Sequence, residues 1–379
     1  MKILEVVFNL RPGGAERFAV DLSNELSKAN EVTLMALKDD SVEPERDLFY
    51  ASELTDRVTY KSVGIGKGYS VHTVVKIHKA IKKEKADIVH LHGDKMPHYC
   101  ILAIFLLHRK MKFYQTIHSD IHNGYDSLFY RFLVKTVGYQ KKMGFIALSE
   151  TNYRDMIDVY PKIKGACIPN GRAPIVPTDR FDETREEMAS YKSAADSRIY
   201  LHVARCNLVK NQRLLVEAFG KLTEKGYHAD LIIIGPGFEN KLGESIRAKA
   251  GTHVHFIGTR KNVGDYMLHA DVFCLSSDYE GMPITLLEAS LVGLPIVSTP
   301  VCGAVDIIEN KVNGVLSEGH TVGQYLDALE YSYQHLCELR QNSFKMKDDS
   351  AYTIENCARK YMDFFQSVIR ESIFIWLCQ

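Results

Sequence analysis

The 379-residue sequence has no excess of charge of either sign, because 47 Lys and Arg residues balance 47 Asp and Glu residues. Proteins dedicated to nucleic-acid binding are usually basic, so this balance argues against a nucleic-acid partner, although it leaves room for a local basic patch. The hydrophobic content of 46% is ordinary for a globular protein and excludes intrinsic disorder as the main state.

Paired cysteines and long hydrophobic runs are also missing. The eight cysteines are scattered, without a Cys-x-x-Cys pair or a short cluster with histidine, so we expect reduced thiols in a cytoplasmic protein. The longest apolar run, Cys100 to Leu107, is far shorter than the ~20 residues that span a bilayer, which predicts no transmembrane helix. Residues 1–10 lead into a Pro-Gly-Gly turn rather than a cleavage site, and we interpret them as a strand rather than a signal peptide.

Short apolar runs alternate with longer amphipathic stretches along most of the chain. Residues 2–8 and 88–91 have the pattern of strands, whereas residues 15–27 and 71–81 have the pattern of helices. Strands separated by helices predict βαβ crossovers and a parallel sheet covered on both faces, the arrangement of α/β proteins.

The composition changes between residues 170 and 198, where Pro, Asp, Glu, Lys and Ser are frequent and apolar periodicity is poor. We interpret this segment as a linker with a polar lead-in, because strand and helix patterns resume after it. The sequence therefore predicts two tandem doubly wound α/β domains, residues 1–169 and 170–357. Such sheets bind ligands beyond the carboxyl ends of their strands, so two of them facing each other would form a cleft.

The most informative segment runs from Ser276 to Ala289. A strand ends there, a polar loop carrying Glu280 follows, and Pro283 stands where a helix containing Glu288 would begin. The N-terminal end of a helix attracts phosphate, and carboxylates accept hydrogen bonds from vicinal hydroxyls of a sugar. Taken alone, the spacing favours a solvated loop carboxylate at Glu280 and an ordinary helix-face residue at Glu288.

Two cations, Arg205 and Lys210, lie on the predicted loop after the first strand of the second domain. A guanidinium fork and an ammonium would stabilise a diphosphate leaving group as negative charge develops on it. Two ordinary surface cations are the alternative interpretation.

These residues resemble the retaining, nucleotide-sugar-dependent glycosyltransferases of the GT-B fold, specifically family four, which contains bacterial polysaccharide and lipopolysaccharide transferases. The family's Glu-x7-Glu frame is read here as E-G-M-P-I-T-L-L-E-A from Glu280 to Ala289. Residues 203–211 resemble its Arg-x4-Lys-Asn loop, and further family-like segments are 234–237, 256–258, 270–273, 293–297 and 313–314. The resemblance implies two Rossmann-like domains facing a cleft, with the donor in the second.

The resemblance also implies residue roles. Catalytic roles would fall to Glu280 on the sugar hydroxyls, Arg205 and Lys210 on the diphosphate, and His118 in the first domain. Donor binding would involve Glu288 on the ribose together with Gly13, Gly14, Gly235, Gly281, Met282 and Pro283.

The first domain carries weaker signals. The turn at Gly13 and Gly14 resembles the family's glycine-rich loop after strand one, although a Gly-Gly pair is usually only a turn. His118, in Thr-Ile-His-Ser-Asp, matches the cleft histidine that family members place by the transferred sugar. A buried histidine satisfied by the backbone is the alternative, and His92 is a second, weaker candidate.

Two features limit what the resemblance implies. No Asp-x-Asp motif occurs, so we expect no metal and no other cofactor, with cationic side chains and a helix end in place of the metal. Cys302 replaces a glycine of the family's loop, and Asp306 stands where the family often has Glu, so donor specificity is not inherited through this loop.

The expected function is therefore retaining transfer of a sugar from a UDP- or GDP-sugar to a hydroxyl of a glycan or lipid-linked acceptor, in the synthesis of surface polysaccharide. A sugar-nucleotide epimerase of the same fold and a non-catalytic carbohydrate-binding scaffold are the alternatives.

A cytoplasmic location is expected, and contact with the inner face of the membrane is left open. Basic residues gather in the first domain at positions 79–85, 109–112 and 135–142, between apolar residues such as 105–107 and 132–134. They form either a solvated charged face or a contact with anionic lipid. Residues 373–378 either insert in the same surface or belong to a last helix, about 358–379, that packs back on the first domain as in family members.

Overall fold

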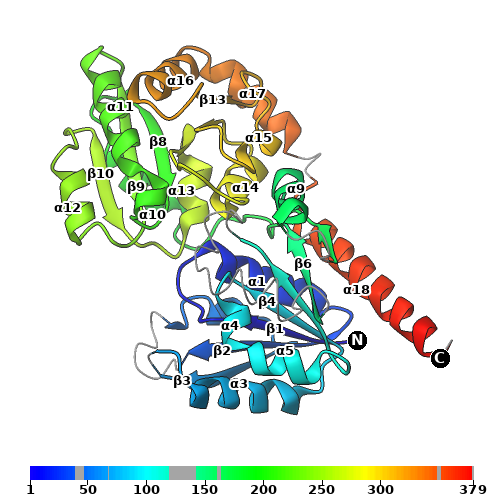
Figure 1. The fold of residues 1–379 in the computed structure, drawn as a ribbon. Helices are drawn as coiled ribbons and strands as arrows, with labels where there is room; N and C mark the ends of the chain where they lie inside the picture. The colour runs from blue at the N-terminus through cyan, green and yellow to red at the C-terminus, as the bar shows by residue number, and fades with distance from the viewer. Residues whose placement is uncertain (39–46, 67, 119–141, 160–163, 348–350, 378–379) are drawn as a thin grey trace. The chain divides into compact units, whose positions relative to one another are not determined.

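The computed structural model describes residues 1–38, 47–66, 68–118, 142–159, 164–347 and 351–377. The chain divides into two compact units, the first formed by Met1–Ala173 with Ala351–Gln379 and the second by Pro174–Ser350 (Figure 1). Each unit is an α/β layer structure around one parallel sheet, in agreement with the predicted fold class.

The sheet of unit 1 has the strand order β3-β2-β1-β4-β5-β6-β7, and all of its pairs are parallel. The strands are β1 (Lys2–Val7), β2 (Glu31–Lys38), β3 (Val58–Ile65), β4 (Ile88–His92), β5 (Lys112–Thr116), β6 (Met143–Ala147) and β7 (Gly165–Cys167). The described helices are α1 (Gly14–Leu26), α3 (Val71–Glu84), α4 (Met96–Tyr99), α5 (Ile101–Leu107), α9 (Glu150–Val159) and α18 (Ile354–Leu377), with a short 3-10 turn η1 (Ala51–Glu53).

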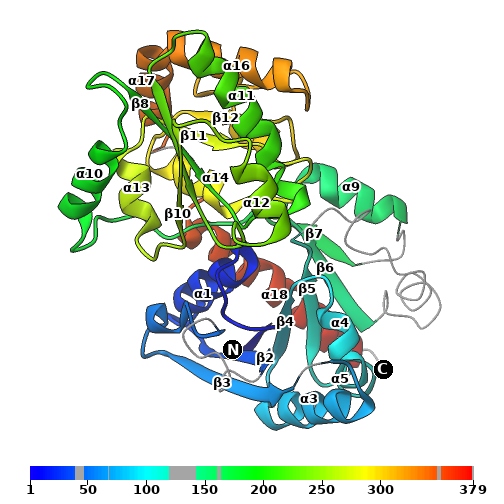
Figure 2. The ribbon, with the colours of Figure 1, turned by 90° about the vertical axis from the view of Figure 1, so that its left-hand side faces the viewer.

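Helices cover both faces of this sheet, as the near-continuous apolar strands require. On one face, α3 and α5 bury Ile77, Ile81 and Ile104 against strands β1, β4 and β5. On the other face, α1 packs beside the C-terminal helix α18, whose Tyr361 and Phe365 are fully buried (Figure 2). Unit 1 is thus built from both ends of the chain.

The sheet of unit 2 has the strand order β10-β9-β8-β11-β12-β13 and is also entirely parallel. Its strands are β8 (Arg198–Val203), β9 (Ala229–Ile234), β10 (Val254–Gly258), β11 (Val272–Leu275), β12 (Ile296–Ser298) and β13 (Gly314–Leu316). Its helices are α10 (Phe181–Ser190), α11 (Gln212–Glu224), α12 (Lys241–Arg247), α13 (Val263–His269), α14 (Ile284–Leu291), α15 (Ala304–Ile307), α16 (Val322–Gln334) and α17 (Leu336–Met346), with a 3-10 turn η2 (Leu208–Lys210).

The interpretation of residues 170–198 as a linker was wrong for its middle part, where α10 forms. Among the ten residues of α10, only Thr184 and Met188 are buried, so the helix shows little apolar periodicity in the sequence. It is held by polar contacts instead. Glu187 accepts a hydrogen bond from Arg260, at 3.0 Å, and another from the hydroxyl of Tyr266 on α13. None of the described helices combines the length and apolar character needed to cross a membrane.

A buried histidine joins the two central strands of unit 2. His202, on β8, is fully buried and its Nδ1 lies 2.9 Å from the carbonyl oxygen of Cys274 on β11. Burial lowers the pKa of His202 to about 4, although this hydrogen bond partly opposes the shift. The imidazole is therefore neutral at pH 7 and donates from Nδ1, which fixes the ends of the strands that carry the candidate site.

This titration predicts an acid-sensitive fold. The folded pKa of His202 is lower than the unfolded value of ~6.5, so the unfolded state takes up the proton first and stability falls as pH decreases from about 6.5 to 4, by about 3 kcal/mol. His202→Asn keeps a donor for Cys274 but does not titrate. We expect its unfolding free energy, from urea unfolding at pH 4 to 7, to fall less on acidification than that of the wild type. Parallel pH profiles would contradict this assignment.

Candidate functional site

The predicted site residues of unit 2 lie on two loops that follow neighbouring strands. Arg205 and Lys210 follow β8, and residues 276–283 follow β11, which pairs with β8 at the centre of the sheet. The order of the strands reverses at this point, and in open α/β sheets ligands bind beyond the carboxyl ends of strands at such a reversal.

The two loops are joined by an ion pair. The ammonium group of Lys210 contacts Oε1 of Glu280, and the hydroxyl of Ser277 donates a hydrogen bond of 2.6 Å to the same oxygen. The side chains of Lys210 and Glu280 are 23% and 13% exposed, so the pair is neither fully buried nor freely solvated. Among the described residues, no hydrogen bond engages the second oxygen of Glu280, Oε2, which leaves this atom able to accept one from a ligand.

Further hydrogen bonds hold the loops in register. The backbone amide of Asp278 donates to the carbonyl of Val209 at 2.8 Å, and the hydroxyl of Ser276 donates to the carbonyl of Lys210 at 2.8 Å. Thr299, which follows β12, donates from its hydroxyl to the carbonyl of Ser277 at 2.6 Å. The position of Glu280 is therefore set by backbone contacts on both sides as well as by its own ion pair.

Asn211 is a site residue whose role sequence reasoning missed. Its φ of 43° lies in the left-handed region, which asparagine tolerates better than most residues. Its side-chain oxygen accepts from the amide of Leu214 at the start of α11, and its side-chain nitrogen donates to Asp278 at 2.8 Å. The Lys-Asn pair in the sequence was the available signal, because a left-handed cap directly after Lys210 turns the chain sharply there.

The remaining predicted residues of unit 2 lie on the same edge of the sheet. Arg205 is exposed, and its carbonyl accepts a hydrogen bond of 3.0 Å from the side chain of Gln212. Pro283 is the N-cap of α14, so the helix begins one residue later than predicted, and Glu288 is 9% exposed within it. Gly281 and Met282 are buried at the end of the loop.

Two glycines on neighbouring loops, after β9 and β12, allow those loops to approach the loops after β8 and β11 closely. Gly235 has a φ of 147°, and a Cβ there would meet the carbonyl oxygen of Ala204 at 2.1 Å. Gly303, the N-cap of α15, has a φ of 77°, and its Cβ would meet the carbonyl oxygen of Gly281 at 2.7 Å. The structure thus gives Gly235 a packing role, whereas its predicted contact with a donor stays a prediction.

In unit 1, Gly13 and Gly14 follow a strand at the reversal of the strand order, and His118 follows the second strand beyond it. Gly13 is the N-cap of α1, which begins at Gly14 after strand β1. His118 follows β5, and its ring lies 5.8 Å from that of Phe18 on α1. Nε2 of His118 is 3.4 Å from Nδ1 of His92, so the contact of this half-buried histidine is a side chain and not the backbone.

Burial dominates the electrostatics around His118. It lowers the pKa of His118 well below the usual value, and repulsion from His92 and His90 adds to this. The ring is neutral at pH 7 and is suited to accept or donate hydrogen bonds rather than to carry charge. Three side chains beneath this ring lie close enough together to hold a metal ion, namely Glu5, His90 and His92. They are the only such group of His, Cys, Asp or Glu among the described residues.

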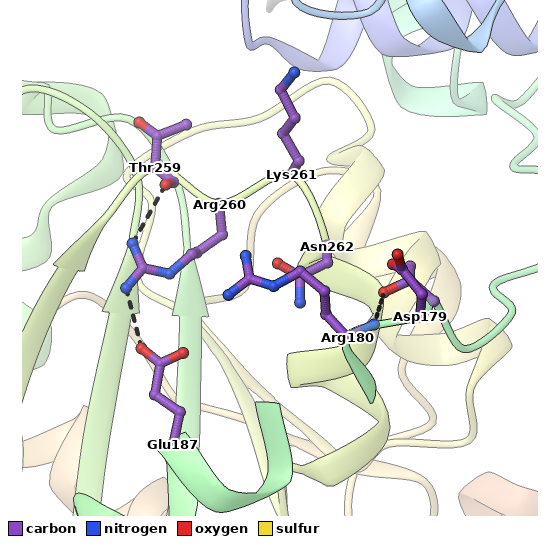
Figure 3. A pocket seen from close by; sticks show the side chains of 8 residues that line it. Asp179, Arg180, Glu187, Thr259, Arg260, Lys261 and Asn262 are labelled. Atoms are coloured by element: carbon purple, nitrogen blue, oxygen red, sulfur yellow. Dashed lines mark hydrogen bonds and ion pairs between the residues drawn. The ribbon is translucent and has the colours of Figure 1, made fainter. Parts of the chain in front are cut away.

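A cavity of about 670 Å³ lies elsewhere in unit 2, lined by residues 178–180, Glu187 and residues 259–262 (Figure 3). None of the predicted site residues lines it. Its Arg260 donates to Glu187 at 3.0 Å and to the hydroxyl of Tyr266 at 3.0 Å, so this guanidinium holds α10 to α13. Arg180 pairs with Glu183 in the same helix region. We interpret the cavity as a structural junction.

Comparison with known proteins agrees with this architecture. Two tandem doubly wound units, each around one parallel sheet, are the architecture of the GT-B glycosyltransferases. The model of Glycosyltransferase Family 4 matches residues 12–174, and that of Glycosyl transferases group 1 matches residues 183–342. The chain therefore belongs to the family-four glycosyltransferases.

Individual relatives are distant. An uncharacterized glycosyltransferase of Methanocaldococcus jannaschii is 28% identical over 239 residues, 59% of this chain and 58% of that protein. A UDP-Gal:alpha-D-GlcNAc-diphosphoundecaprenol alpha-1,3-galactosyltransferase of Escherichia coli is 24% identical over 323 residues, 79% of this chain and 76% of that protein. The crystal structure of HepE from Anabaena with UDP and glucose has a TM-score of 0.79 at 16% identity and covers 97% of this chain and 100% of its own.

The crowding at Gly303 leads to a stability prediction. Gly303→Ala places a Cβ 2.7 Å from the carbonyl of Gly281 and also strains a left-handed residue. Gly226→Ala is the matched control, because its φ is 88° but no atom lies within 4 Å of the added Cβ. From urea unfolding we expect a loss of about 1 kcal/mol for the control and about 3 kcal/mol for Gly303→Ala. Equal losses would show that the loops can separate without cost.

Proposed function

We propose that this chain is a retaining glycosyltransferase that transfers a sugar from a nucleoside-diphosphate donor, UDP- or GDP-linked, to a hydroxyl of a glycan or lipid-linked acceptor. The observation that carries the proposal is the joined pair of loops in unit 2, where Lys210 and Glu280 lie together at the reversal of the strand order. The complex of HepE with UDP and glucose supports a nucleotide donor for this fold.

The donor binds to unit 2 in this proposal. Arg205, which is exposed, and Lys210 bind the diphosphate, and Glu288 binds the ribose hydroxyls. An ammonium group has three donors, so Lys210 can keep its contact with Glu280 while it donates to a phosphate oxygen. The cation then opposes the charge that develops on the leaving phosphate as the glycosidic bond breaks.

Glu280 orients the sugar rather than attacking it. Ser277 and Lys210 both bind its Oε1, which fixes the carboxylate, and Oε2 accepts from a sugar hydroxyl. Gly281, Met282 and Pro283 bring the backbone and the start of α14 close to the donor. In unit 1, which binds the acceptor, Gly13, Gly14 and His118 supply contacts to sugar hydroxyls or phosphate.

The reaction proposed here needs no metal at the donor diphosphate, because Arg205, Lys210 and the helix start supply the positive charge. A chelator such as EDTA should then leave transfer unchanged. Proportional loss of activity with EDTA, restored by a divalent cation, would contradict this part of the proposal.

A lipid-linked acceptor would place the enzyme at the cytoplasmic face of a membrane, and the E. coli relative is named for a diphosphoundecaprenol substrate. In unit 1, exposed Lys79, Lys82 and Lys83 on α3 lie in the same layer as the exposed Leu106 of α5. Exposed lysines next to apolar side chains suit peripheral contact with anionic lipid. Residues 119–141 and the side chains of 370–379, which include other members of the predicted basic and apolar surface, lie outside the described residues.

A screen of nucleotide sugars tests the donor class. UDP-, GDP-, ADP- and CMP-sugars are added to the purified protein, and thermal unfolding is followed. We expect a UDP- or GDP-sugar to stabilise the fold selectively, by about 2.7 kcal/mol at a concentration of 100 Kd. Stabilisation by none of the four, in a well-folded protein, would contradict a nucleotide-sugar site and favour a non-catalytic scaffold.

Substitution of the ion pair tests the catalytic assignment. Lys210→Ala and Glu280→Gln should each lower transfer about 10²- to 10³-fold, because each removes a group that acts on the bound donor. The matched controls are Lys249→Ala and Glu217→Gln, which break an exposed ion pair in the same unit and should leave transfer unchanged. Full activity in either site variant would refute the role of that residue. Conversion of the nucleotide sugar into its epimer without an acceptor would identify an epimerase instead.

A further inference from the structure

A network of polar side chains, all of them buried except the half-buried His118, connects Glu5 to His118 in unit 1. It begins at Glu5, in the middle of the central strand β1. The carboxylate of Glu5 is fully buried. A buried charge is costly unless it is paired. The members of this network come from β1, β4, α18 and the end of β5 with the residues after it. They are Glu5, His90, His92, Thr116, His118 and Tyr361.

Two imidazoles meet one oxygen of Glu5. Nε2 of His92 lies 2.6 Å and Nδ1 of His90 lies 2.8 Å from Oε2 of the carboxylate. The parallel register of β1 and β4 pairs Glu5 with His90, and His92 is two residues further along the same face of β4. Burial alone would raise the pKa of Glu5, but the charge and hydrogen bonds of the two histidines outweigh it and lower the pKa to about 2.

An ionised Glu5 determines where the proton of His92 resides. A carboxylate can only accept, so Nε2 of His92 must carry the hydrogen of the 2.6 Å bond. Burial, with repulsion from His90, lowers the pKa of His92 to about 4 although Glu5 opposes the shift, so the ring has a single proton at pH 7. Nδ1 of His92 is therefore a lone pair.

This lone pair faces His118. Nε2 of His118 lies 3.4 Å from Nδ1 of His92, and two lone pairs cannot form a hydrogen bond, so the proton of the neutral His118 belongs on Nε2. Nδ1 of His118 then keeps its lone pair. Among the described residues no hydrogen bond engages this atom, so it can accept one from a ligand.

We propose that Glu5, acting through His92, is a positioning residue that holds His118 in the Nε2–H tautomer, with Nδ1 presented as an acceptor for a sugar hydroxyl. The proposal rests on the proposed function only for the identity of that hydroxyl. The tautomer itself follows from the hydrogen bonds within unit 1. A second branch, from His90 through Thr116 to Tyr361 of α18 with contacts of 2.7 and 2.9 Å, completes the support of Glu5.

A metal ion held by Glu5, His90 and His92 is the competing occupant of this place. Two ligands each ~2.0 Å from a tetrahedral metal are separated by about 3.3 Å. The separation of 2.6 Å from Glu5 to His92 is shorter and is that of a hydrogen bond, and the ion-pair distance of 2.8 Å from Glu5 to His90 is also too short for two ligands of one metal. The geometry therefore favours protons between these groups.

The tautomer can be measured directly. The full chain is labelled with ¹⁵N-histidine, and two-bond ¹H–¹⁵N spectra are recorded at pH 7, with the His118 signals assigned from their loss in His118→Gln. We expect a pyrrole-type Nε2 and a pyridine-type Nδ1 for His118. A proton on Nδ1, or an imidazolium, in the wild-type protein would overturn the proposal without any variant.

Glu5→Gln and His92→Gln test the origin of the tautomer. A glutamine amide at position 5 can donate as well as accept, so His92 is no longer fixed and His118 should become a mixture of tautomers. Thr116→Val is the matched control, because it breaks the other branch at equal burial and should leave His118 unchanged. If His118 keeps one tautomer in the folded Glu5 and His92 variants, the proposal is wrong. Zn²⁺ that binds the wild type, shifts His90 and His92 and is lost in Glu5→Gln would overturn it in favour of a metal site.

Turnover separates this inference from the proposed function. Turnover is measured with the nucleotide sugar that responds in the screen. Glu5→Gln should lower kcat between about 10- and 100-fold with KM for the donor little changed, because Nδ1 of His118, which accepts the hydrogen bond of the sugar hydroxyl, is misplaced. A shift of tautomer without a change in kcat would refute the role of His118 in transfer but support its positioning by Glu5. Loss of turnover without a shift of tautomer would refute the positioning alone.

Discussion

The contact between Lys210 and Glu280 is the interaction on which the candidate site depends. It joins the loop after β8 to the loop after β11, two strands that pair at the point where the order of the sheet reverses. Without it, each loop would carry a partly buried charge that has lost its partner. Ser277, Asn211 and the backbone contacts of Asp278 make the join specific, because they fix the positions of the two charges and not only their attraction.

Unit 1 also holds a carboxylate by ion pairs and hydrogen bonds, but this carboxylate is more deeply buried than Glu280. Its carboxylate, Glu5, is also at a reversal of the strand order, but it is fully buried and its partners are imidazoles. Removal of a charge from water costs several kcal/mol, so the buried network has to be permanent. The partly exposed pair of unit 2 costs less to rearrange, and Lys210 can take a second partner. One unit therefore holds a fixed network, and the other holds an adjustable one.

The sequence predicted most of this architecture because parallel strands buried on both faces leave continuous apolar runs. The strand β3 was missed because it lies at the edge of its sheet, and its Val58–Ile65 segment alternates poorly between buried and exposed positions. The Glu-x7-Glu frame located Glu280 and Glu288 without any structure. Asn211 and Ser277 required the structure. Asn211 contacts Asp278 in the other loop, 67 residues further along the chain, and Ser277 donates to Glu280 three residues away within its own loop.

Glu5 could not be predicted from its own neighbourhood, because a glutamate within Lys2–Val7 has the pattern of a residue on a solvated face. The detectable signal was on another strand, where His90 and His92 alternate at a spacing of two residues and so share one face of β4. Only the pairing of β1 with β4 places the carboxylate between them.

The two candidate residues that would touch a sugar are held in the same way. Glu280 is bound by the protein at Oε1 and His118 at Nε2, and among the described residues no hydrogen bond engages Oε2 of the one or Nδ1 of the other. A side chain whose hydrogen-bonding sites are all occupied by the protein has none left for a ligand, and a side chain with none occupied loses rotamer entropy when it binds one. Fixing one atom and leaving the other for the ligand avoids both costs, since the orientation is already established before binding. This division explains why polar partners accumulate behind each candidate residue, at Ser277 and Lys210 in one unit and at His92 and Glu5 in the other.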